Sequence, residues 1–128
     1  MVMSLLTEAD FGNALPIDGY GPGFFRVAGE VRRGHLWVMA DAVGAWGGFE
    51  DLATLEALAG QIDLLFIGTG AEIAHLPKPF VSALEAKGIM CEGMATPSAA
   101  RTYNVLLSEG RRVGCALLAM PEAGEARA

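Results

Sequence analysis

Two apolar segments that stop abruptly at turn-forming residues constrain the fold of this chain more than any other feature. The first, residues 62–67, has almost no polar side chain and is followed by Gly68-Thr69-Gly70. The second, residues 89–94, is followed by Thr96-Pro97 and then by a helical pattern. Apolar runs of this length are typical of inner strands of a parallel sheet, because both of their faces are buried. We therefore expect the two segments to lie side by side in the same direction, with their carboxyl ends at one edge of the sheet.

The order of the other patterns predicts a single three-layer α/β domain with a mixed β-sheet. Residues 24–31 and 34–40 are rich in aromatic and branched side chains, and they predict an N-terminal β-hairpin with its turn at Arg32-Arg33-Gly34. A β-α-β-α-β unit follows, and its last strand is expected at residues 113–120. The 128 residues suffice for one core, so we expect a single domain over residues 1–128. Its ordered core should span about residues 11–120, and residues 1–10 and 121–128 should be flexible.

The ends of the predicted helices carry recognisable capping residues. Asp51 is placed to cap a short helix that ends at Gly60. Thr96 is expected to be the N-cap of a longer helix, because a hydroxyl residue followed by Pro97 is a typical helix start. Gly110 should end that helix.

Charge and hydropathy exclude several classes of partner. The formal net charge is -6, and the basic residues are scattered except for the pairs Arg32-Arg33 and Arg111-Arg112. Because nucleic-acid affinity depends on a cationic footprint, we expect no nucleic-acid partner. No apolar run approaches the roughly 20 residues of a membrane-spanning helix, so membrane insertion is not expected.

The cysteines and the first residues bear on the cellular compartment. Cys91 and Cys115 lie in apolar segments and form no CxxC motif, so they predict buried, reduced thiols and a reducing compartment. Residues 1–10 lack the basic region and long apolar stretch of a secretory signal. We therefore expect a cytoplasmic protein.

One set of polar residues is predicted to gather at the carboxyl ends of the two parallel strands. The start of the second long helix offers free N–H groups and partial positive charge, and an arginine one turn later could reach an anion. The candidate ligand-binding residues are Thr69, Glu72, Thr96, Ser98, Arg101 and Asn104. The alternative is structural: Thr96 caps its helix, Ser98 is solvated, and Arg101 and Asn104 hold neighbouring loops.

Other chemical motifs are incomplete. Gly68-Thr69-Gly70 begins like a dinucleotide fingerprint, but Ile73 occupies the position of the third glycine. Glu72 and His75 could share a helix face and bind a metal, yet one such pair supplies too few ligands for a di-metal centre. We therefore predict no catalytic residues, no metal site and no cofactor, and we lean towards a protein that is not an enzyme.

Several short patterns, in their order and spacing, resemble a known family. They are Ile17-Asp18-Gly19-Tyr20, the aromatic and glycine pattern around Trp46, Gly68-Thr69-Gly70, and Thr96-Pro97-Ser98-Ala99 running into Thr102-Tyr103-Asn104. Together they resemble the Mth-type uncharacterised domain family, which includes the mitochondrial NADH dehydrogenase (complex I) assembly factor three and an adipogenesis-associated protein. The similarity runs from about Ile17 to Met120. It implies a three-layer α/β fold with a mixed central sheet, and it supplies no catalytic residues.

Two hypotheses about function follow. The resemblance implies a non-enzymatic protein-interaction domain that assists assembly of a membrane or respiratory complex. Its partner would be another protein, and the sequence leaves homo-oligomerisation open. The contact surface would include apolar residues of the 44–49 loop, with Trp46 as the anchor, unless Trp46 closes the core instead. The alternative is a small-molecule or anion-binding protein, or an unrecognised enzyme, with its site at the carboxyl ends of the parallel strands.

Overall fold

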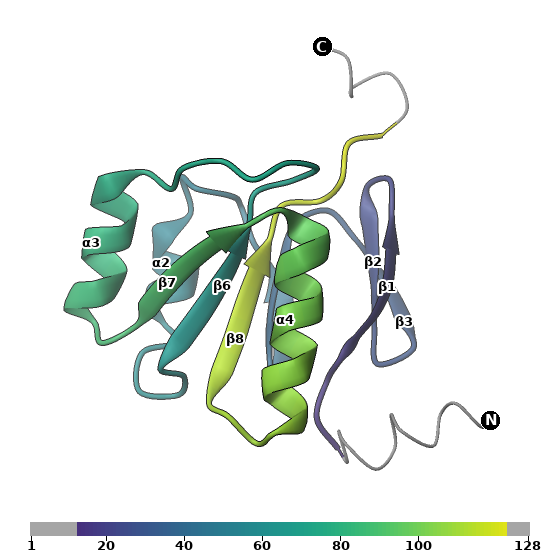
Figure 1. Cartoon of the computed structure of the whole chain (residues 1–128), viewed down its shortest axis with the longest axis horizontal. Helices are drawn as coiled ribbons and strands as arrows, with labels where there is room; N and C mark the ends of the chain where they lie inside the picture. Colours follow the sequence, from purple (N-terminus) through teal and green to yellow (C-terminus); the bar gives the residue numbers. More distant parts are fainter. Residues whose placement is uncertain (1–12, 123–128) are drawn as a thin grey trace.

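The computed structural model describes residues 13–122, which form two β-sheets and three helices (Figure 1). The smaller sheet has the order β1-β2-β3 and comprises β1 (Ile17–Gly21), β2 (Phe24–Val27) and β3 (Glu30–Arg33). The larger sheet has the order β5-β4-β8-β6-β7 and comprises β4 (Leu36–Met39), β5 (Ala42–Ala45), β6 (Leu64–Gly68), β7 (Met90–Met94) and β8 (Val113–Leu117). The helices are α2 (Leu52–Glu56), α3 (Lys78–Ala86) and α4 (Thr96–Ser108). The segments expected to be flexible lie outside the described residues, apart from Pro121 and Glu122.

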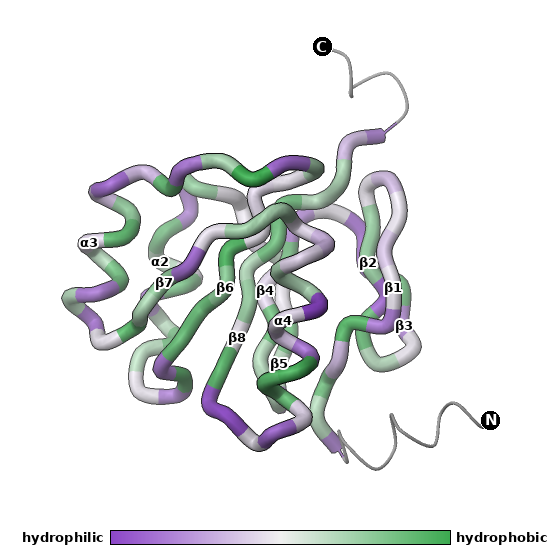
Figure 2. Tube along the Cα trace, viewed as in Figure 1, coloured by the Kyte–Doolittle hydropathy of each residue, from purple (hydrophilic) through white to green (hydrophobic). Residues whose placement is uncertain are grey.

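The larger sheet is mixed, as predicted, and its centre is parallel. Strand β6 pairs in parallel with β7 on one side and with β8 on the other. Strand β4 runs antiparallel to both β8 and β5. The two apolar segments therefore lie next to each other in the same direction, and their carboxyl ends meet at one edge of the sheet. Figure 2 shows β6 and β8 as hydrophobic along most of their length, in keeping with this inner position.

The helices cover opposite faces of this sheet. The chain passes from β6 through α3 to β7 and then returns through α4 to β8, on the other side of β6. Because crossovers between parallel strands are right-handed, two crossovers in opposite directions place their helices on opposite faces. Strand β6 serves both faces: Leu65 and Ile67 pack with Leu84 of α3, whereas Phe66 packs with Tyr103 of α4. The predicted three-layer α/β architecture is confirmed.

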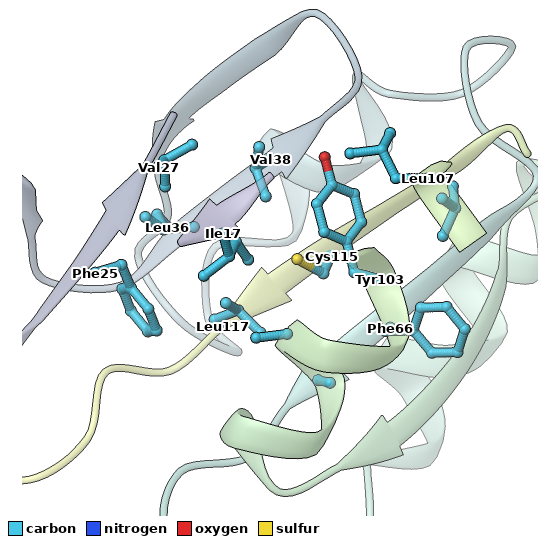
Figure 3. Close-up of a cluster of buried hydrophobic side chains, with 13 residues drawn as sticks. Ile17, Phe25, Val27, Leu36, Val38, Phe66, Tyr103, Leu107, Cys115 and Leu117 are labelled. Atoms are coloured by element: carbon cyan, nitrogen blue, oxygen red, sulfur yellow. The ribbon is translucent and has the colours of Figure 1, made fainter. Parts of the chain in front are cut away.

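The smaller sheet shares the α4 side of the larger sheet. Phe25 and Val27 of β2 are buried together with Tyr103 of α4 and with Cys115 and Leu117 of β8 (Figure 3). Each of these side chains is at most 2% exposed. The small sheet, α4 and the large sheet therefore enclose one apolar cluster, and a second cluster lies beneath α2 and α3.

The N-terminal hairpin exists, but its predicted position was wrong. Strands β2 and β3 pair antiparallel with Val27 opposite Glu30, so the turn lies at Ala28-Gly29 and not at Arg32-Arg33-Gly34. Both turn residues have positive φ, 47° for Ala28 and 87° for Gly29, as a two-residue turn of the primed type requires. Alanine seldom adopts that conformation, so the sequence signal of this turn is weak. The chain then crosses at Gly34 into β4, which belongs to the larger sheet.

Candidate functional site

The end of β6 packs directly against the start of α4. A Cβ atom placed on Gly68 would lie 2.7 Å from Thr96 Oγ1 and 2.9 Å from Thr96 Cα, closer than such atoms approach in proteins. Position 68 therefore requires glycine. The first glycine of Gly68-Thr69-Gly70 therefore allows α4 to pack closely on β6. The close approach of α4 to β6 also brings Thr96 within hydrogen-bond distance of Gly70, in the loop after β6.

Thr96 is fully buried, and its hydroxyl group joins two strand ends. Its Oγ1 donates to the carbonyl of Leu118, 2.8 Å away, and accepts the N–H of Gly70 at 2.9 Å. Its own N–H donates to the carbonyl of Gly70 at 2.8 Å. The expectation that Thr96 is the N-cap was wrong, because Ala95 holds that position and the hydroxyl turns towards the sheet instead of its own helix.

Thr69 forms the matching connection between β6 and β7. Its N–H donates to the carbonyl of Met94 at 2.8 Å. Its hydroxyl oxygen lies 2.7 Å from the carbonyl of Glu72 and 3.1 Å from that of Met94, and it accepts the N–H of Ala74 at 3.1 Å. We refer to Thr69 and Thr96 as the threonine pair. Together they bind the ends of β6, β7 and β8 to one another.

The threonine pair leaves little hydrogen-bonding capacity for a ligand. A hydroxyl group has one hydrogen to donate, and in both threonines it points to a carbonyl within the chain. Glu72 contributes its backbone carbonyl to this arrangement, whereas its side chain is exposed. Residues 71–77 form no helix, so Glu72 and His75 do not share a helix face.

The candidate residues on α4 separate into different environments. Asn104 bonds both backbone groups of Ile17: its Nδ2 donates to the carbonyl at 2.8 Å and its Oδ1 accepts the N–H at 2.9 Å. Arg101 is exposed and lines a shallow hollow of about 160 Å³ together with Asn104, Asp18 and Tyr20. Ser98 is half-buried in the first turns of the helix. The structure thus brings Thr69 and Thr96 together at the sheet edge and places Asn104 against β1.

The segment after β5 places Trp46 in the interior. Its side chain is only 3% exposed, and its Nε1 donates to the carbonyl of Asp51 at 3.1 Å. The ring packs edge-to-face on Phe49, with centroids 5.8 Å apart, and contacts Phe80 of α3. Trp46 therefore closes the core beneath α3 and offers no exposed ring to a partner.

Asp51 fixes the conformation of this segment. Its carboxylate accepts the N–H of Gly47 at 2.9 Å and the hydroxyl of Thr54 at 2.7 Å, and it caps α2 as predicted. These hydrogen bonds, that of Gly47 first, lower the pKa of Asp51 below its usual value of 3.8. The carboxylate therefore stays ionised at neutral pH and keeps the Trp46 loop in place.

The ionisable groups of the core are poor nucleophiles. Burial, with a smaller contribution from the charge of Glu85, raises the pKa of Cys91 to about 11. Burial also raises the pKa values of Cys115 and Tyr103, and the hydroxyl of Tyr103 donates to the carbonyl of Leu15 at 2.9 Å. Both cysteines are free thiols. A thiolate is the reactive form of cysteine, so neither side chain is activated at neutral pH.

Residues 13–122 contain neither a metal-binding cluster nor a membrane-spanning helix. No cluster of three or more histidine, cysteine, aspartate or glutamate side chains in this part of the chain is arranged to hold a metal ion. Within the same residues no helix has both the length and the apolar character needed to cross a bilayer.

A basic hollow lies between the edges of the two sheets, and no sequence pattern predicted it. It has a volume of about 270 Å³, and Arg32, Arg33 and His35 line it together with Gly44 and Ala45 of β5. The adjacent arginines and the nearby histidine were visible in the sequence. The strand opposite them was not, because Ala42–Ala45 contains a glycine and only one branched side chain.

Comparison with protein families and named relatives gives consistent matches. A family model described as protein of unknown function (DUF498/DUF598) matches residues 17–118. An uncharacterised protein of Rhodobacter capsulatus is 66% identical and covers 91% of this chain and 94% of its own length. NADH dehydrogenase [ubiquinone] 1 alpha subcomplex assembly factor 3 of Danio rerio is 33% identical over 89% of this chain and 68% of its own length. The chain thus spans about two thirds of that assembly factor.

Solved structures share the fold. A structure described as an outer membrane protein from Bartonella henselae matches with a TM-score of 0.77 and 36% identity, covering 86% of this chain and 98% of that one. A Bordetella pertussis protein described as an Mth938-like domain matches with a TM-score of 0.72 and 26% identity, covering 89% and 91% of the two chains. The arrangement of two sheets and flanking helices is therefore that of the Mth938-like domain.

Proposed function

This chain belongs to the DUF498/DUF598 family, and on that premise we propose that it is a non-enzymatic protein-interaction domain that assists assembly of a membrane or respiratory complex. The observation that carries the proposal is the homology to NADH dehydrogenase assembly factors, which extends over nearly all of the chain. An assembly factor acts by binding other proteins, so its chemistry lies in a recognition surface.

The geometry of the strand ends supports this proposal. At the edge where α/β proteins usually place a ligand, the threonine pair directs its hydroxyl hydrogens to carbonyl groups of the same chain. Both threonine hydroxyls are therefore engaged within the fold and are not left free for a substrate. The free thiols also support our proposal that the protein acts in a reducing compartment such as the cytoplasm.

Affinity capture from the organism that makes this chain tests the proposed function. Cells that express the tagged full chain at its native level would be treated with a short cross-linker, and the captured proteins identified by mass spectrometry. We expect subunits of NADH dehydrogenase or of another membrane complex to be enriched over a matched tag-only strain. A chain that is recovered alone, or with a small metabolite and no protein, would contradict the proposal.

A ligand-binding role remains the second candidate because Arg101 is exposed beside a shallow hollow. We propose inorganic phosphate as the probe, since an arginine can donate two parallel hydrogen bonds to it. If Arg101 binds the anion, Arg101→Ala should abolish phosphate binding in isothermal titration and leave the unfolding midpoint nearly unchanged. Equal phosphate binding by the wild type and the variant would exclude this role.

A further inference from the structure

We propose that the free edge of β5, with the basic hollow beside it, binds an extended segment of a partner protein that carries an aspartate or glutamate side chain. The inference rests on the proposed function, because it identifies the surface and the chemistry through which a partner would be recognised. Addition of a strand to an exposed sheet edge is a recurrent mode of peptide recognition, in which backbone bonds supply affinity and side-chain sites supply specificity.

The backbone of β5 has hydrogen-bonding groups available on its outer side. The N–H of Trp46 donates to the carbonyl of His35, which makes these two residues a hydrogen-bonded pair of the antiparallel ladder. Such pairs alternate along a ladder, so Gly44 bonds to β4, whereas Val43 and Ala45 direct their N–H and C=O groups away from it. Strand β5 is the last strand of its sheet, and within residues 13–122 nothing pairs with this outer side.

The sequence of β5 contains none of the features that usually protect an exposed sheet edge. Sheets usually protect an exposed edge with charged side chains, proline or a β-bulge. The strand Ala42–Ala45 contains no charged residue and no proline, and its register with β4 is regular. Ala45 is exposed and Val43 is half-buried, so an additional strand can approach without meeting a large side chain.

The hollow next to this edge supplies hydrogen-bond donors of positive or neutral charge. Arg32, Arg33 and His35 line it, and its lining includes no carboxylate. The Nδ1 atom of His35 accepts the N–H of Ala119 at 2.8 Å, so a neutral His35 ring carries its hydrogen on Nε2. In a chain of net charge -6 this hollow is a local exception, and it is complementary to an acidic side chain.

Arg32 is the residue best placed to bind a carboxylate. It lies opposite Phe25 in the ladder, on the face of the small sheet that is directed towards the interior. Its Nε is buried and has no hydrogen-bond partner. Its only ion pair within the described chain is a long one, 3.8 Å from Nη2 to Glu30 Oε1, between side chains that are 40% and 77% exposed. A buried donor without an acceptor is costly, so the guanidinium, part of a side chain that is 40% exposed, gains from a small movement towards a partner carboxylate.

A short synthetic peptide tests the inference on the full chain. The probe is a capped seven-residue peptide of alternating valine and glutamate, and the control peptide has glutamine in place of each glutamate. Binding would be followed by backbone amide NMR, with hydrogen exchange measured at Val43 and Ala45. We expect the glutamate peptide to slow exchange at both amides, and we expect the glutamine peptide to bind at least about tenfold more weakly.

Two variants that each remove one positive charge distinguish binding at the hollow from a general effect of net charge on peptide affinity. Arg32→Gln should weaken binding of the glutamate peptide about tenfold or more, because it removes the charged donor. Arg26→Gln is the matched control, since Arg26 is an exposed residue of β2 that lies opposite Val31 on the outer face of the small sheet. It should change the affinity by no more than about twofold. Urea unfolding of both variants would verify that they are folded.

The outcomes distinguish this inference from the proposed function. Absence of peptide binding at millimolar concentration, protection at amides other than those of β5, or equal weakening by both variants would overturn the β5 site. If Arg32→Gln and the wild type then captured the same membrane-complex subunits from cells, the proposed function would stand with a different surface. If the peptide protected Val43 and Ala45 while neither protein captured any subunit, the docking edge would stand and the assembly role would fail.

Discussion

Replacement of Thr96 by valine tests the structural role that we assign to the threonine pair. Valine has nearly the shape of threonine, so the change removes the hydroxyl without opening a cavity. It deletes the bond to the Leu118 carbonyl and the bond from the Gly70 N–H, at 2.8 and 2.9 Å. A net hydrogen bond contributes about 1 kcal/mol, and a partner left unpaired in the interior costs about 1–3 kcal/mol. Gly70 and Leu118 are half-buried, so water can compensate in part, and we expect a loss of about 2–4 kcal/mol.

Urea unfolding provides the assay. With a slope of about 2 kcal/mol per molar urea, typical of a domain of this size, the midpoint should fall by about 1–2 M. The amide of Gly70 should also lose protection from hydrogen exchange, because its acceptor is gone. The same measurement on Thr102→Val controls for the change of side chain, since Thr102 lies half-buried on α4 and the structure gives its side chain no hydrogen bond. That control should stay within about 0.5 kcal/mol of the wild type.

Thr96→Ser adds a second control, because it keeps the hydroxyl and loses only a methyl group. It should cost about 1 kcal/mol and leave the Gly70 amide protected. Our reasoning would be refuted if Thr96→Val were as stable as Thr102→Val, or if the Gly70 amide stayed equally protected in both. Either result would free the strand ends for another role.

Three further predictions concern other contacts. Asn104→Ala should destabilise the chain by about 1–2 kcal/mol and speed amide exchange at Ile17, because both bonds to its backbone are lost; unaltered exchange there would contradict the pairing. Cys91, with a pKa of about 11 against an ordinary 9.0, should react with iodoacetamide at pH 8 about a hundredfold more slowly in the folded chain than in urea. Because folding raises the pKa of Cys91, the contribution of this thiol to stability is complete below pH 9 and is lost as the pH rises towards 11. Equal rates of reaction with iodoacetamide in the folded chain and in urea would show that the thiol is exposed. Asp51 behaves oppositely, because folding lowers its pKa. Its contribution to stability is complete above the ordinary pKa of 3.8 and is lost as the pH falls through the lowered pKa of the folded state. A carboxyl NMR titration that gave a pKa at or above 3.8 would disprove the capping bonds.

The parallel centre of the fold could be predicted because it depends on burial alone. Residues 62–67 are apolar on both faces, and an inner strand is the simplest structure that buries both. The same expectation was wrong for residues 89–94, because β7 lies at the edge of the sheet and exposes Met90 and Glu92. Gly110 directly follows Glu109, the C-cap of α4, and has a positive φ, as predicted. Gly60 also has a positive φ, but α2 already ends at Glu56 and not at Gly60.

The remaining features depend on contacts between residues distant in sequence. The turn at Ala28-Gly29 needs a positive φ at alanine, which the sequence gives no reason to expect. Thr96 was a good N-cap candidate by local rules. Because Gly68 has no side chain, however, Thr96 packs directly against the end of β6, and its hydroxyl donates to the carbonyl of Leu118 instead. The burial of Trp46 also depends on a distant residue, because Phe80 lies 34 positions further along the chain and only the fold brings the two rings together.

The basic hollow shows why the candidate surface could not be located beforehand. Arg32 and His35 stand near each other in the sequence, but Ala45 completes the hollow only when β5 pairs with β4. A four-residue strand of small side chains has no distinctive periodicity. Its free edge is therefore a property of the sheet order and not of any motif.

The most direct test of the assembly role is the amount of assembled NADH dehydrogenase in membranes of the source organism after deletion of this chain. Native gel electrophoresis with an NADH-dependent stain would quantify the complete complex in the wild type, in the deletion strain and in the strain complemented with the full chain. We expect a clear loss of the complete complex on deletion and its recovery on complementation. The same amount of complete complex in all three strains would contradict it.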